Sequence, residues 1–208
     1  NFRCTYCHNA SLIPFHPSSS CNPAIKQPPP IVLETFLTWL TLRQHVLTGV
    51  VISGGEATLQ PGLIHALAAI KAMGFSVKLD TNGSQPKVLQ YVLEHNLVDY
   101  VALDIKLPPQ RYHTFSGSTQ TAQFVAESLQ LLRQESIPYE CRTTVAHPLH
   151  RPADVLAIAE WVSGVPRYVL QNFCSPPKET MLAGCEQLSP YPLQELEALQ
   201  QTIAPLVG

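Results

Sequence analysis

The residues that could carry chemistry begin at the start of the chain, where Cys4 and Cys7 are separated by two residues. Thiolates at this spacing can hold one metal centre between them, as half of a zinc site or as ligands of an iron–sulfur cluster. A structural zinc site needs a second close ligand pair, and Cys141, Cys174 and Cys185 do not form one in the sequence. We expect Cys141, within a predicted strand, and Cys174, just after one, to pack in the interior.

A second motif, Gly54-Gly55-Glu56, directly follows the short apolar run at 50–52. Glycines at the end of a strand allow the backbone to approach a ligand closely. A tight strand-to-helix turn without any ligand is the alternative. The acidic residue that follows the glycines at once favours a binding role.

Charged residues also interrupt two predicted strands near their carboxyl ends. Residues i and i+2 of a strand share a face, so Lys78 points with Asp80 and Asp104 with Lys106. Charges in an apolar strand are costly unless they are paired or used. Structural ion pairs are the alternative, but two such pairs at the same end of two strands favour a site. Arg142, on a later strand, is a fixed cation suited to a carboxylate.

The histidines are weaker candidates for catalysis. His8 directly follows Cys7, and a role as a metal ligand is the less favoured interpretation. His147 and His150 flank Pro148 after the end of a predicted strand. A histidine in a loop is more often solvated than catalytic, so we expect both to be solvated.

Five apolar runs alternate with segments of helical periodicity, and these elements must position the motifs. The predicted strands lie at 50–52, 75–79, 100–105, 139–145 and 168–170, and apolar helix faces follow at 63–70, 86–92, 125–132, 155–162 and 193–203. Apolar strands separated by helices form a parallel sheet, as a barrel or an open sheet. Ligands bind at the carboxyl ends of such strands. Four polar residues lie there: Ser53, Asp80, Asp104 and Arg142.

Length and composition exclude several classes of protein. The chain has 208 residues, 45% of them hydrophobic, which predicts a single globular domain over 1–208. A net charge of -2 argues against a nucleic-acid binder. The sequence has no apolar run of about 18 residues, so no membrane span is expected. Six cysteines are too few for a disulfide framework, which favours a reducing, cytoplasmic setting.

Taken in order, these motifs resemble the radical S-adenosylmethionine (SAM) superfamily. Cys4, Tyr6 and Cys7 occupy the last three marked places of its C-x-x-x-C-x-Φ-C loop, and residues 54–56 resemble its Gly-Gly-Glu motif. The closer resemblance is to the activating proteins of anaerobic ribonucleoside-triphosphate reductase, which are glycyl-radical activases. It rests on residues 7–9, 53–61, 79–83, 98–106 and 142–145. The first cysteine of the loop would precede Asn1, which we interpret as an N-terminal truncation. Ala57 stands where the family usually has proline.

The resemblance implies an α/β fold, a partial (β/α)6 barrel of parallel strands whose first strand is missing from this chain. It implies a [4Fe–4S] cluster held by Cys4, Cys7 and a third cysteine just before Asn1, with SAM as the second cofactor. Cys4, Cys7 and Lys106 are the catalytic residues that it implies. The cofactor-binding residues that it implies are Tyr6, His8, Gly54, Gly55, Glu56, Asp80, Asn82, Asp104, Lys106, Arg142 and Gln171. Asp80, Thr81 and Asp104 resemble a monovalent-cation site, with a carbonyl from Ala102.

By the same resemblance, the protein cleaves SAM reductively to a 5′-deoxyadenosyl radical and generates a glycyl radical on a partner enzyme. The implied partners are anaerobic ribonucleotide reductase and an electron donor such as flavodoxin, with no nucleic acid and no membrane. Two alternatives stay open. One is a radical SAM synthase that acts on a small molecule, of the 7-carboxy-7-deazaguanine synthase type. The other is a zinc-binding module without enzymatic activity.

Overall fold

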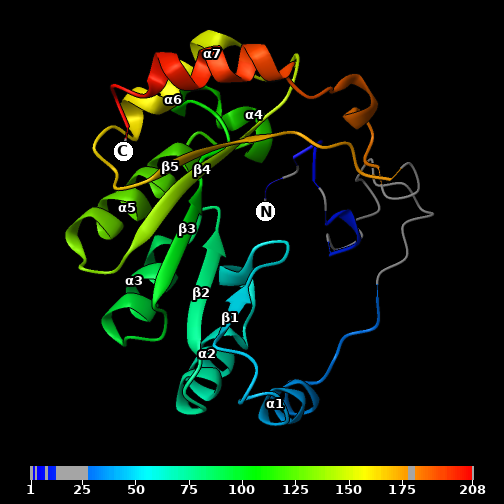
Figure 1. Cartoon of the computed structure of the whole chain (residues 1–208), viewed down its shortest axis with the longest axis vertical. Helices are drawn as coiled ribbons and strands as arrows, with labels where there is room; N and C mark the ends of the chain where they lie inside the picture. Colours follow the sequence, from blue (N-terminus) through cyan, green and yellow to red (C-terminus); the bar gives the residue numbers. More distant parts are fainter. Residues whose placement is uncertain (1, 3, 8, 13–27, 178–180, 208) are drawn as a thin grey trace. The chain divides into compact units, whose positions relative to one another are not determined.

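The structure is a computed structural model that describes residues 2, 4–7, 9–12, 28–177 and 181–207 (Figure 1). Its strands are β1 (Gly49–Ile52), β2 (Ser76–Thr81), β3 (Tyr100–Asp104), β4 (Tyr139–Val145) and β5 (Tyr168–Asn172). They form one parallel sheet in the order β1-β2-β3-β4-β5. The prediction of a parallel α/β fold with five strands is therefore confirmed. Strand β2 continues to Thr81, two residues beyond its predicted end, so Asp80 lies within the strand.

A helix follows every strand, as the apolar periodicity predicts. Helix α1 (Leu33–Thr41) precedes β1, and the helices after the five strands are α2 (Leu63–Ala72), α3 (Pro86–Glu94), α5 (Thr121–Gln134), α6 (Pro152–Trp161) and α7 (Leu193–Ile203). The short helix α4 (His113–Ser116) lies between β3 and α5. Helices α3 and α6 begin with proline, whose missing N–H and restricted φ suit the first turn of a helix. No helix in the described part of the chain is long and apolar enough to span a bilayer.

The chain divides into two compact units. The first unit comprises residues 1–28, 104–123 and 140–208, and the second comprises 29–103 and 124–139. In the second unit, β2 alternates between a buried face with Val77 and Leu79 and a partly exposed face with Lys78 and Asp80. The period of two thus sends apolar side chains to the core and charged ones to the opposite face. The fully buried leucine and isoleucine side chains of this unit include Leu67, Ile70, Leu79, Leu89, Leu103, Leu129 and Leu132.

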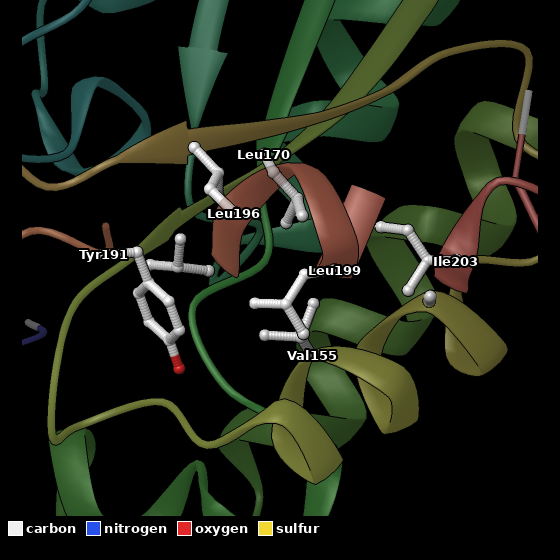
Figure 2. Packing of buried hydrophobic residues seen from close by; sticks show 8 residues of the cluster. Val155, Leu170, Tyr191, Leu196, Leu199 and Ile203 are labelled. Atoms are coloured by element: carbon white, nitrogen blue, oxygen red, sulfur yellow. The ribbon is translucent and has the colours of Figure 1, made fainter. Parts of the chain in front are cut away.

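The first unit has a core between its two strands and its two long helices, α6 and α7 (Figure 2). Its buried members are Val145, Val155, Ala159, Leu170, Tyr191, Leu196, Leu199 and Ile203. Leu196, Leu199 and Ile203 recur at helical spacing along α7, so one face of that helix is buried. Shortening one of these leucines to alanine would cost about 2 to 5 kcal/mol. This core holds α6 and α7 against the strands whose ends carry candidate site residues.

Candidate active site

The two amino-terminal cysteines lie in one tight turn, in which the Cys7 N–H donates to the Cys4 carbonyl at 3.1 Å. Cys4 belongs to a buried cluster with Tyr6, Ala146, Phe173 and Cys185. Burial raises the pKa of the Cys4 thiol to about 11, although Lys106 opposes this shift. At neutral pH the thiol therefore keeps its proton until a metal displaces it.

The chemistry of this turn fits an iron–sulfur centre, since thiolates are the soft ligands that iron–sulfur clusters use. Within the described residues, no three His, Cys, Asp or Glu side chains are grouped as a metal site. Cys141 is buried, as predicted. The same prediction for Cys174 is wrong, because this cysteine lies past the end of β5 and is exposed.

Three charged residues lie close together in the same unit as the cysteine turn. We call these residues, Asp104, Lys106 and Arg142, the charge cluster. Arg142 Nε donates to Asp104 Oδ1 at 2.9 Å. Arg142 Nη2 lies 2.8 Å from the same oxygen. Lys106 Nζ donates to Asp104 Oδ2 at 3.0 Å. Burial alone would raise the pKa of Asp104, but Lys106 and Arg142 outweigh it and hold this pKa below its usual range. The cluster carries one more positive than negative charge, which suits a bound carboxylate.

Arg142 is held from its other side as well. Glu140, two residues earlier on the same face of β4, places Oε1 3.9 Å from Arg142 Nη1. The other Glu140 oxygen lies 3.4 Å from Nε of Arg167. Thr144, next along this face, donates to the side-chain oxygen of Gln171 on β5 at 3.3 Å. Charges of alternating sign thus fix the direction of the Arg142 side chain.

Two residues that support this unit could not be found from the sequence. His150 is completely buried, so the expectation that it is solvated is wrong. Its ring hydrogen-bonds to the backbone of Lys106, a residue 44 positions away. Tyr112 is also completely buried, and its hydroxyl accepts from the Lys106 N–H at 2.9 Å. Local sequence patterns cannot predict these contacts, because the contacts depend on how distant segments pack together.

In the second unit, the Gly-Gly-Glu motif is tied down by the side chain of Glu56. Its Oε1 accepts from the Thr58 N–H at 3.1 Å, from the Thr58 hydroxyl and from the Thr81 hydroxyl at 2.7 Å. Its Oε2 accepts from the Asn82 N–H at 2.8 Å. The carboxylate therefore joins the carboxyl ends of β1 and β2. Gly54 has φ 144°, a conformation that residues with a side chain rarely adopt.

The stretch after β2 is equally constrained. Gly83 has φ +73°, and a Cβ at this position would lie 2.7 Å from Cδ1 of Leu103. The hydroxyl of Ser128 on α5 donates to the Gly83 carbonyl at 2.8 Å. The side-chain oxygen of Asn82 accepts from the Ser84 N–H at 3.0 Å. Backbone conformation and neighbouring side chains together hold Asn82 at the end of the strand.

Several predicted assignments stay predictions. Asp80 has Lys78 Nζ 3.7 Å away, and Asp104 has Lys106, so both carboxylates of the expected monovalent-cation site already face a lysine. The Thr81 hydroxyl, the third expected ligand, donates to Glu56. His8 lies outside the described residues.

The ring of Tyr6, which the resemblance assigns to cofactor binding, is buried and lies edge-on to His150 with centroids 6.2 Å apart. The expectation that polar residues of the two units share one site also stays a prediction.

Proteins similar to this chain are known both by sequence and by fold. The chain is 29% identical over 178 residues to a protein of Methanocaldococcus jannaschii whose name describes it, provisionally, as a glycyl-radical enzyme activating enzyme. That alignment covers 83% of this chain and 69% of the relative.

Several solved structures share the fold, among them the two that follow. The structure of archaeal TYW1 matches 90% of this chain and 68% of its own, with a TM-score of 0.59 and 15% identity. Streptococcus suis SuiB bound to the precursor peptide SuiA matches 98% of this chain and 43% of its own, with a TM-score of 0.66 and 12% identity. At these identities the likeness concerns the fold alone.

The family is decided by a family model. The model of the radical SAM superfamily matches residues 1–162, which include the cysteine turn, the Gly-Gly-Glu motif and the charge cluster. The match covers well over half of the 208 residues. The chain therefore belongs to the radical SAM superfamily, a membership that implies an iron–sulfur cluster and SAM as cofactors.

Proposed function

We propose that the protein is a glycyl-radical enzyme activating enzyme and that its partner is an anaerobic ribonucleoside-triphosphate reductase. The observation that carries the proposal is the pairing, within one unit, of a buried thiol turn with a charge cluster that acts electrostatically on Cys4. The similarity to a relative named as such an activating enzyme supports the reaction class. The ordered motifs described above support the choice of reductase.

In this proposal, Cys4 and Cys7 hold a [4Fe–4S] cluster. When bound, the cluster supplies the electron that cleaves SAM to methionine and a 5′-deoxyadenosyl radical, which takes a hydrogen atom from a glycine of the partner. The charge cluster binds the SAM carboxylate through its excess positive charge, which Lys106 and Arg142 provide. Asp104 holds both cations in place, because each of its oxygens engages one of them.

The Gly-Gly-Glu motif of the second unit contributes backbone rather than charge in this proposal. Backbone carbonyls of Gly54, Gly55 and Glu56 accept hydrogen bonds from the SAM ammonium group. The Glu56 carboxylate is fully used by Thr58, Thr81 and Asn82, so its role is to fix that backbone. Holding donors and acceptors in place before SAM arrives reduces the cost of ordering it.

Five further residues complete the proposed SAM site. Tyr6, His8 and Gln171 lie on the adenine side of SAM in this proposal. Asp80, on the charged face of β2, contributes with Asn82 at the end of that strand. An electron donor such as flavodoxin reduces the cluster. Each assignment predicts that substitution weakens SAM binding, and isothermal titration measures this directly.

The test of the reaction uses protein expressed from its native gene and purified without oxygen. Iron and sulfide are reconstituted, and dithionite and SAM are added. We expect iron-dependent formation of 5′-deoxyadenosine and methionine, measured by liquid chromatography. If neither product forms, the proposal fails.

The test of the partner adds the anaerobic reductase and records electron paramagnetic resonance spectra. We expect a glycyl-radical signal that disappears when the radical-bearing glycine of the reductase is replaced by alanine. SAM cleavage with turnover of a small molecule, and without any protein partner, would favour a small-molecule synthase instead. Zinc without iron in the purified protein would favour the non-enzymatic module.

A further inference from the structure

The backbone of Lys106 is held by two buried side chains. The Lys106 N–H donates to the hydroxyl oxygen of Tyr112 at 2.9 Å, and the Lys106 carbonyl lies 2.8 Å from Nε2 of His150. A carbonyl oxygen can only accept, so Nε2 must carry the proton. Nδ1 of His150 accepts from the Ala146 N–H at 3.3 Å, which requires that this nitrogen has no proton. The two contacts together specify one neutral tautomer of the imidazole.

His150 is itself fixed from several directions. Its side chain is completely buried, and its ring packs edge-on against Tyr6 of the cysteine turn. Its backbone carbonyl accepts from the hydroxyl of Tyr191, a member of the core between α6 and α7. Burial lowers the pKa of His150, which keeps the ring neutral near neutral pH. The imidazole is therefore a rigid donor that joins the segment after β4 to the segment after β3.

These two hydrogen bonds fix the position of the Lys106 backbone, and therefore the position of its Cα and Cβ atoms. Its far end is already paired, because Nζ donates to Asp104 at 3.0 Å. With backbone and ammonium group both held, Lys106 has little freedom to move when a ligand binds. Positioned charges bind a carboxylate better than mobile ones because less entropy is lost on binding.

We propose that His150 is a positioning residue for SAM binding. His150 acts through its hydrogen bond to the Lys106 carbonyl, which holds the charge cluster in its binding geometry. This inference rests on the proposed function, because it assumes that the charge cluster binds SAM. It assigns no contact between His150 and SAM. His150 instead supports the group that makes the contact.

Two substitutions separate the hydrogen bond from the packing of the ring. His150→Phe keeps an aromatic ring against Tyr6 but cannot donate to Lys106. His150→Gln loses the ring but keeps an amide N–H near the place of Nε2. We expect the Phe variant to raise the Kd and KM for SAM about tenfold, the effect of losing a partly buried hydrogen bond to the Lys106 carbonyl, with kcat nearly unchanged. The Gln variant should stay within about threefold of the wild type.

A double-mutant cycle with Lys106→Met tests whether the effect passes through Lys106. We expect His150→Phe to change the Kd for SAM by less than about twofold in the Lys106→Met background. A cluster-free measurement gives a second readout: hydrogen exchange of the peptide around Lys106 should be faster in His150→Phe than in His150→Gln. Val155→Ala is the matched control, since it weakens the core of the same unit without removing a hydrogen bond to His150 or Lys106. Its Kd for SAM should be unchanged.

The outcomes distinguish this inference from the proposed function. If the wild type binds SAM and His150→Phe binds it equally well, the inference is overturned alone. Equal losses in the Phe and Gln variants, persisting in the Lys106→Met background, would show a purely structural role and also overturn it. Failure of the wild type to bind SAM would overturn both. If His150→Phe does not fold, Tyr112→Phe removes the hydroxyl partner of the Lys106 N–H and should raise the Kd in the same way.

Discussion

Replacing Glu56 by glutamine changes one atom of a carboxylate that accepts four hydrogen bonds. Glutamine has a single acceptor oxygen, and its amide group is itself a donor. In the best orientation the oxygen keeps its bonds to Thr58 and Thr81, while the amide faces the N–H of Asn82. One hydrogen bond is then lost in a buried site, and the others lose the assistance of the charge.

The size of the effect follows from these two losses. A buried donor left without its acceptor costs about 1 to 3 kcal/mol, and weaker bonds to the threonines add to this. We expect Glu56→Gln to lower the free energy of unfolding by about 3 kcal/mol. For a chain of this length, that corresponds to a melting temperature about 6 to 12 °C lower.

The assay is urea unfolding of the cluster-free protein, followed by circular dichroism. Glu94→Gln is the matched control, because Glu94 is exposed on α3 and accepts a bond from Gln90. The control should change the free energy of unfolding by less than about 0.5 kcal/mol. If Glu56→Gln is as stable as the control, the carboxylate does not hold the ends of β1 and β2 together as argued.

Four other substitutions test the cysteine turn, the charge cluster and the turn after β2. Cys4→Ser and Cys7→Ser should each abolish reconstitution of a brown iron-containing protein; iron content equal to the wild type would contradict their role as ligands. Asp104→Asn should lower the free energy of unfolding of the cluster-free protein by about 2 to 4 kcal/mol near neutral pH, because two cations lose their anion. The pKa of Asp104 is lowered in the folded protein, so this contribution exists above its ordinary value of 3.8 and disappears as pH falls through the folded value. The difference between wild type and variant should thus shrink in acid, and a difference that is constant with pH would refute the ion pairing. Gly83→Ala should lower the free energy of unfolding by about 1 to 3 kcal/mol, because Gly83 has a φ of +73° and a Cβ there would meet Leu103. Gly62→Ala is the control and should be nearly neutral, because nothing lies close to a Cβ at that position. Equal stabilities of the two variants would show that Gly83 is not constrained.

Local patterns in the sequence were sufficient to predict the five strands and the helices that follow them, and they also indicated the candidate residues, whose roles stay predictions. The buried face of a strand repeats every two residues and that of a helix every three to four, so neighbouring residues carry the information. The pairing of Asp104 with Lys106 belongs to this class, because residues i and i+2 share a strand face. The cysteine turn and the backbone conformation of Gly54 in the Gly-Gly-Glu motif also depend on close neighbours in the sequence.

The exposure of Cys174 shows the limit of such patterns. The residue stands only two positions after β5, and the sequence alone does not say whether the chain then turns inward or outward. His150 shows the same limit in the opposite direction, since a loop position suggested solvent and the packed protein buries it completely. Burial of a residue beyond a strand end depends on which other segments cover it.

The sequence by itself determined the elements, their order and the residue types at the strand ends, because each depends on close neighbours along the chain. Only the tertiary structure decided which groups those residues meet. Glu56 reaches Thr81 across 25 positions, Asp104 reaches Arg142 across 38 and His150 reaches Lys106 across 44. Such bonds depend on tertiary packing that brings distant segments together, and hydrogen bonding requires atoms to be placed within a few tenths of an ångström.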